Sequence, residues 1–99
     1  NSSNNEERKG VSTYYKHIGF RPLTTAILRN MLTLGLDEFG NVGNFNFALN
    51  GPTDFPNSLV EIAFLSNASD EKRILNAKFR DDVAKKVYLG ITQWLLSMK

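Results

Sequence analysis

Residues 58–65 read SLVEIAFL, a nearly continuous apolar run with one charged residue, Glu61, at its middle. A run of this length and composition predicts a β-strand that is buried on both faces of a sheet. Residues 66–69, SNAS, follow with side chains that commonly cap helices, and acidic residues then open a short helix predicted over residues 70–75. The stretch 58–75 therefore predicts a buried strand that leads directly into a helix.

A longer helix is predicted upstream, beginning at Pro22. Proline suits the first turn of a helix because its missing N–H has no intrahelical partner there. The apolar residues that follow recur at spacings of three and four and define one broad face: Leu23, Ile27, Leu28, Met31, Leu32 and Leu34. Gly35 stands where a left-handed C-terminal cap is preferred, and Leu36 can fold back on the last turn.

Two further strands are predicted. Residues 11–15, VSTYY, are β-branched and aromatic, and residues 44–49, NFNFAL, alternate between apolar and small or polar side chains. Residues 37–43, DEFGNVG, have the composition of a turn, and residues 50–57 break the second of these strands with two prolines and a glycine.

A final helix is predicted over residues 78–98. Its apolar positions form a stripe at helical spacing: Val83, Val87, Ile91, Trp94 and Met98, thickened by Ala84, Tyr88 and Leu95. We predict that Trp94 is a core residue. The charged residues 70–73, DEKR, and the pair 85–86 are interpreted as solvated helix faces.

Composition limits the function classes. The chain has 99 residues, 41% hydrophobic residues and a net charge of +2, which predicts one small domain without a nucleic-acid surface. It has no cysteine and a single histidine, so disulfide scaffolds, thiolate nucleophiles and a self-contained catalytic zinc site are excluded. No apolar run is long enough for a membrane span, and we expect no signal peptide within this sequence.

The order of elements favours an α/β fold, in which strands alternate with helices. About three strands are visible, which is few for a sheet that buries a strand such as residues 58–65. The first ten residues, NSSNNEERKG, are polar and predict a flexible loop or a cut end. The sheet therefore looks incomplete.

Glu61 is the most informative residue. A carboxylate flanked by apolar neighbours should be largely desolvated, and burying it unpaired costs several kcal/mol. It could act as a general acid or base at the end of a buried strand. It could equally form a buried ion pair with Arg21, Arg29 or Arg80.

Four other polar residues have a functional and a structural interpretation. His17 could be a ligand or a hydrogen-bonding surface residue. Arg21, at the entrance of the first helix, could bind a carboxylate or phosphate or be solvated. Asn44 and Asn46 could donate to a polar ligand or lie beneath a loop.

The strand and helix around Glu61 resemble a known family. The matching features are Pro56, residues 59–61 (LVE), residues 64–67 (FLSN), the acidic helix start, and the final helix with Gly90 and Ile91. They resemble the C-terminal part of zinc-dependent N-acetylmuramoyl-L-alanine amidases, which cleave peptidoglycan. Residues 10–15, GVSTYY, resemble the strand that follows the family's last zinc-binding histidine.

The resemblance covers essentially the whole chain but only the second half of the family's domain. It implies a three-layer α/β domain with a central mixed sheet of about six strands and flanking helices, of which residues 1–99 supply the C-terminal part. It implies that zinc is held by two histidines and a glutamate of the first half, with no metal ligand in this chain. It also implies that Glu61 is the catalytic glutamate.

Two positions depart from the family pattern. Ala63 stands where the family usually has glycine, and Asn50 stands where an arginine commonly follows the strand. We therefore name Asn50, with His17, Arg21, Asn44 and Asn46, as candidate substrate-binding residues.

The function implied by the resemblance is hydrolysis of the amide between N-acetylmuramic acid and L-alanine by zinc-activated water, with Glu61 as general acid and base. The implied partners are peptidoglycan and the N-terminal half of the same domain, and the implied location is the bacterial cell envelope, periplasmic or secreted. One alternative is a metal-free wall-binding or regulatory module with the same fold. Another is a structural domain in which Glu61 forms an ion pair. On its own, the chain is expected to bind no catalytic zinc and to show no amidase activity.

Overall fold

The computed structural model describes residues 4–43 and 56–98. Its described elements are, in chain order, β1 (Val11–Tyr14), the short 3₁₀ helix η1 (Ile18–Phe20), α1 (Arg21–Leu32), β2 (Glu38–Val42), β3 (Leu59–Glu61), α2 (Ala68–Ile74) and α3 (Ala77–Ser97). The three described strands form one sheet in the order β2-β1-β3. β1 is parallel to β2 and antiparallel to β3, so the sheet is mixed and the predicted α/β class is confirmed.

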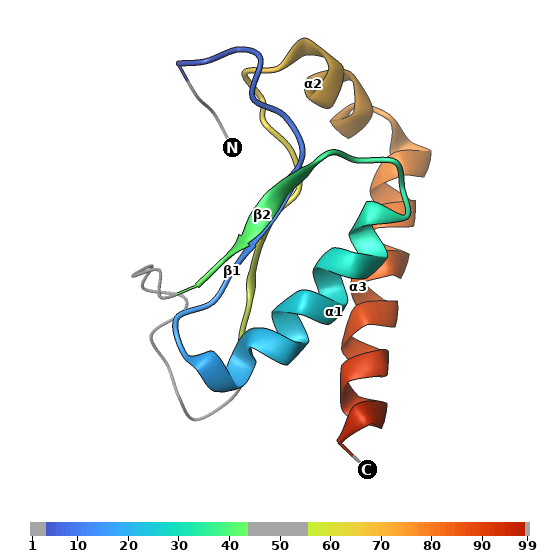
Figure 1. Ribbon diagram of the computed structural model, residues 1–99. Helices are drawn as coiled ribbons and strands as arrows, with labels where there is room; N and C mark the ends of the chain where they lie inside the picture. Colours follow the sequence, from blue (N-terminus) through green and yellow to red (C-terminus); the bar gives the residue numbers. More distant parts are fainter. Residues whose placement is uncertain (1–3, 44–55, 99) are drawn as a thin grey trace.

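The hydrophobic core lies between the sheet and the two longer helices. α1 packs on the sheet, and α3 lies beside α1 (Figure 1). The buried core residues are Val11, Leu23, Ile27, Leu28, Met31, Leu36 and Val83. No helix in the described part of the chain is both long and apolar enough to cross a membrane.

α1 confirms the helix predicted from local signals. Pro22 stands in its first turn, and Gly35 follows the helix with a φ of 77°. A positive φ costs glycine little because it has no Cβ. Leu36 then folds back into the core, as predicted.

The predicted turn at residues 37–43 is wrong, because Glu38–Val42 forms β2. Residues Gly40 and Asn41 pair with Ser12 and Thr13 of β1. The register shifts between Val11 and Ser12, which leaves Phe39 outside the one-to-one pairing. A bulged strand with a single described neighbour tolerates the glycine and asparagine that suggested a turn. The strand predicted over residues 44–49 lies outside the described residues.

The strand predicted over residues 58–65 is also too long. β3 ends at Glu61, and its three residues are only partly buried. Ala63 and Phe64 are buried, but they lie in the turn that enters α2. Phe64 donates its backbone N–H to the Asp70 carboxylate at 2.9 Å instead of to a strand, which explains why the ladder stops.

α2 and α3 begin at asparagine caps. Asn67 Oδ1 accepts from the Asp70 N–H at 3.1 Å, and Asn76 Oδ1 accepts from the Phe79 N–H at 3.0 Å. The cap predicted within residues 66–69 is thus confirmed, although α2 begins two residues earlier than predicted. The predicted range of the final helix is confirmed to within one residue at each end.

The apolar stripe predicted on α3 divides into two faces. Val83 is buried, and Val87 and Trp94 are partly buried against the core. The other face is exposed in the described part of the chain and comprises Tyr88, Ile91, Leu95 and Met98. These four residues were predicted to belong to the apolar stripe, but α1 contacts the side of α3 that carries Gly90.

Gly90 sets the closest approach of α1 and α3. A Cβ at this position would lie 2.6 Å from the Ile27 Cα and 2.9 Å from the Ile27 nitrogen. These are backbone atoms, so a helix must move to admit a methyl group. We expect Gly90→Ala to lower the free energy of unfolding by about 1–3 kcal/mol in urea titrations, despite the higher helix propensity of alanine.

Gly19 offers a matched control, because a Cβ there meets nothing within 4 Å. Gly19→Ala should change the free energy of unfolding by no more than about 0.5 kcal/mol. Equal stability of both variants would show that the two helices are not in backbone contact at Gly90.

Candidate functional site

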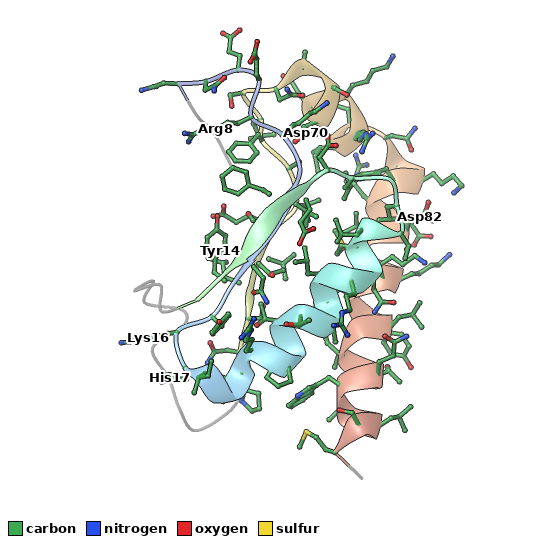
Figure 2. The ribbon with its side chains drawn as sticks, viewed as in Figure 1. Arg8, Tyr14, Lys16, His17, Asp70 and Asp82 are labelled. Carbon is green, nitrogen blue, oxygen red and sulfur yellow. The ribbon has the colours of Figure 1, made fainter. Side chains whose placement is uncertain are left out.

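The two faces of the sheet differ in chemistry. Val11 and Val60 pack into the core beneath α1. Side chains alternate along a strand, so Ser12 and Tyr14 point to the opposite face. Glu61 is paired directly with Ser12 and therefore shares that face. In Figure 2, Tyr14 lies on the side of the sheet away from α1 and α3.

Thr13 follows the same alternation toward the helices. Its Oγ1 donates to Asn41 Oδ1 of β2 at 3.2 Å, and Asn41 Nδ2 donates to Thr25 Oγ1 of α1 at 3.0 Å. This polar chain fixes β1 and β2 against α1, and β3, which carries Glu61, pairs with β1.

Glu61 belongs to a chain of three hydrogen-bonded side chains. Ser12 Oγ donates to the Tyr14 hydroxyl at 3.1 Å, and that hydroxyl is hydrogen-bonded to the Glu61 carboxylate. Ser12 is fully buried and Tyr14 is 7% exposed. Glu61 is only half-buried, which corrects the prediction of a largely desolvated carboxylate. The carboxylate thus has a fixed buried partner and an accessible side.

Burial raises the pKa of the Tyr14 phenol above its ordinary value of 10.0. The hydrogen bond from Ser12 opposes this shift, whereas the negative charge of Glu61 and the hydrogen bond to it act in the same direction as burial. Tyr14 therefore remains protonated at neutral pH and can donate to the carboxylate.

The predicted alternative of an ion pair at Glu61 is not found in the described part of the chain. The salt bridges there join Lys9 to Asp37, Lys78 to Asp82 and Lys85 to Asp81. Arg80 donates instead to the Ile74 carbonyl at 2.7 Å. The partner of Glu61 within residues 4–43 and 56–98 is a neutral phenol rather than a guanidinium.

The structure does not bring Glu61 together with the two other described candidates. His17 follows the end of β1, whereas Glu61 pairs near its start, and the His17 ring makes an edge contact with Phe20 at 5.6 Å between centroids (Figure 2). Arg21 begins α1, on the helical side of the sheet. Asn44, Asn46 and Asn50 lie outside the described residues, and substrate binding by any of these five residues stays a prediction.

Arg21 instead lines an open groove between α1 and α3. The groove has a volume of about 690 Å³, and its lining includes Arg29 and Trp94. Among the described residues of this lining, the two arginines are the only charged ones. They suit an anionic group, but they lie on the other side of α1 from the Glu61 face.

A second acidic residue that the sequence analysis misjudged is Asp70. It was interpreted as part of a solvated helix face, but it is 3% exposed. Its Oδ2 accepts from the Gly10 N–H at 2.8 Å and from the Phe64 N–H at 2.9 Å. Asp70 therefore joins the N-terminal loop to the turn after β3 (Figure 2). Both carboxylate bonds are to backbone N–H groups, which indicates a structural role.

Comparison with known proteins decides the family. The sequence profile described as N-acetylmuramoyl-L-alanine amidase matches residues 1–93, which is nearly the whole chain. The chain belongs to this family. The resemblance seen around Glu61 is thereby confirmed.

Two relatives are amidases named AmiC. That of Neisseria meningitidis serogroup B is 34% identical over 82 residues, which cover 72% of this chain and 20% of the relative. That of Escherichia coli O6:H1 is 28% identical over 94 residues, which cover 84% of this chain and 22% of the relative. This chain thus spans about a fifth of the length of these relatives.

Solved structures support the family fold. The catalytic domain of CwlV, an N-acetylmuramoyl-L-alanine amidase from Bacillus (Paenibacillus) polymyxa, is 29% identical with a TM-score of 0.88, and the match covers 96% of this chain and 53% of that one. An N-acetylmuramoyl-L-alanine amidase from Clostridium difficile 630 is 25% identical with a TM-score of 0.92, covering 100% and 55%. This chain spans about half of each solved chain.

Within residues 4–43 and 56–98, no group of three or more His, Cys, Asp or Glu side chains could hold a metal ion. These residues alone therefore do not supply a ligand set for the zinc ion that the resemblance implies.

Proposed function

We propose that this chain forms part of a peptidoglycan amidase that hydrolyses the amide between N-acetylmuramic acid and L-alanine. Membership of the amidase family supports the substrate class. The observation that carries the proposal is the half-buried Glu61 carboxylate, which is held by a neutral hydrogen bond on the face of the sheet opposite α1. The corresponding location is the bacterial cell envelope, periplasmic or secreted.

Glu61 is proposed to transfer protons in this reaction. Its carboxylate accepts a proton from the attacking water and delivers it to the nitrogen of the leaving alanine amine. A carboxylate with no cation bound to it is better suited to this role than one fixed in an ion pair, because its lone pairs stay available. Among the described residues, Glu61 meets this condition.

The zinc ligands are proposed to come from the N-terminal half of the same domain. They would then lie outside residues 4–43 and 56–98. Zinc in such a site polarises the scissile carbonyl and lowers the pKa of a bound water. Two features support a companion segment. The chain spans about half of the solved amidase domains, and the α3 face with Tyr88, Ile91, Leu95 and Met98 is exposed. Apolar patches of this kind often mark contacts between proteins or between segments of one fold.

A chimeric domain tests the proposal. The part of the CwlV catalytic domain that this chain does not cover is fused to residues 1–99, and release of free N-terminal alanine from peptidoglycan is measured. We expect the chimera with zinc to release alanine, and the isolated 99-residue chain to release none.

The control chimera carries the matching half of the Clostridium difficile relative on the same CwlV segment. If this control is active and the test chimera folds and binds zinc without hydrolysis, the hydrolytic function is wrong. Retention on peptidoglycan without hydrolysis would then favour the alternative of a wall-binding or regulatory module. Turnover by the isolated chain would refute the assignment of zinc ligands to a companion segment.

A further inference from the structure

We propose that Tyr14, oriented by Ser12, is a positioning residue that fixes the Glu61 carboxylate for proton transfer. The inference rests on the proposed function of Glu61 and extends it to two residues of β1. Its basis is the hydrogen-bonded series Ser12–Tyr14–Glu61 on the face of the sheet opposite α1.

The direction of these bonds follows from their chemistry. A tyrosine hydroxyl has one proton, and an ionised carboxylate can only accept. Because Ser12 donates to the Tyr14 oxygen at 3.1 Å, the Tyr14 proton is free to point at Glu61. One of the carboxylate's four lone-pair positions is then occupied, and the others remain available for water.

The series is held rigidly. β1 is the middle strand of the described sheet, between β2 and β3. Ser12 is 0% exposed and Tyr14 is 7% exposed, so close packing restricts the motion of both side chains. Glu61 itself is half-buried and lies in the last position of the short strand β3, where its own backbone restrains it least. The fixed phenol therefore supplies the orientation that the strand end does not.

This arrangement predicts a specific kinetic effect. The orientation of the Glu61 carboxylate affects the proton-transfer step but not the binding of the glycan or peptide. Loss of this orientation therefore lowers kcat with little change in KM. In the active chimera we expect Tyr14→Phe to lower kcat about 10- to 100-fold and KM to change less than about 2-fold. Ser12→Ala should lower kcat less than Tyr14→Phe does, because it leaves the Tyr14 hydroxyl in place.

Tyr15→Phe is the matched control, because Tyr15 is the adjacent buried tyrosine and its hydroxyl lies beside Gly43. It should leave kcat unchanged. If Tyr14→Phe matches Tyr15→Phe, the positioning role is wrong. If Glu61→Gln also remains active, the proposed function fails as well, so the two failures can be told apart.

A titration of the 99-residue chain tests the contact without any catalysis. The ¹³Cζ signal of Tyr14, assigned with Tyr14→Phe, should titrate above pH 10 in a chain that circular dichroism shows to be folded. Because Glu61 raises this pKa and Ser12 lowers it, Glu61→Gln should move the midpoint down and Ser12→Ala should move it up. A midpoint that is unmoved in Glu61→Gln would overturn the proposed contact.

Discussion

Glu61→Gln is expected to lower the rate of alanine release by the assembled domain about 10²- to 10⁴-fold, the range over which general acid–base catalysts contribute. Glutamine has nearly the same size as glutamate, and its amide oxygen can still accept the hydrogen bond from Tyr14. It cannot take a proton from water at neutral pH. The substitution therefore removes the proposed chemistry and leaves the local packing in place.

Zinc content separates this effect from loss of the metal. Glu61 is not among the implied zinc ligands, so the variant should bind as much zinc as the unsubstituted domain when both are measured by atomic absorption. The control is Glu38→Gln, which removes an exposed carboxylate from the neighbouring strand β2 and should leave the rate unchanged. A Glu61→Gln domain that releases alanine at a near-normal rate would exclude Glu61 as the acid–base group.

The parts of the fold that depend on local signals were predictable. α1 begins in a turn that contains Pro22 and is followed by Gly35 in a left-handed conformation, as residues 22–35 predicted. Caps and helix-spaced apolar residues act within one or two turns, so one sequence carries all the information that they need.

The strands were less predictable because pairing is not local. Glu38–Val42 has the residues of a turn and becomes β2 only because β1 lies alongside it. The apolar run after Glu61 suggested a longer strand, but Phe64 turns away to bond Asp70. Composition indicates burial in this run and does not distinguish a buried strand from a buried turn.

The candidate site also has a part that was predictable from the sequence and a part that was not. Glu61 was identified from its apolar neighbours and from the family pattern, whereas Ser12 and Tyr14 were missed. They are separated from Glu61 by about half of the chain and meet it only through the antiparallel register of β1 and β3. Alternation within residues 11–15 places Ser12 and Tyr14 on one face, but which residues they face depends on that register.

Asp70→Ala is expected to produce the largest loss of stability, about 2–5 kcal/mol in the free energy of unfolding measured in urea. The substitution leaves the Gly10 and Phe64 N–H groups without their acceptor. Each is a backbone donor bonded to a carboxylate that is 3% exposed, and a buried donor without a partner costs about 1–3 kcal/mol. The two bonds hold the N-terminal loop and the turn after β3 at one point, so both segments should lose amide protection together.

Asp70→Asn and Glu71→Ala complete this test. Asparagine keeps an oxygen that can accept one of the two bonds, so its cost should lie between that of alanine and zero, and it remains measurable if Asp70→Ala does not fold. Glu71 is the next residue of α2 and is exposed, so Glu71→Ala loses only a favourable charge at the helix N-terminus, worth at most about 1 kcal/mol. Asp70→Ala with the same urea midpoint as Glu71→Ala would mean that the carboxylate does not anchor these segments. A large loss confined to Asp70 would show that the second acid of residues 58–75 holds in place the turn that follows Glu61.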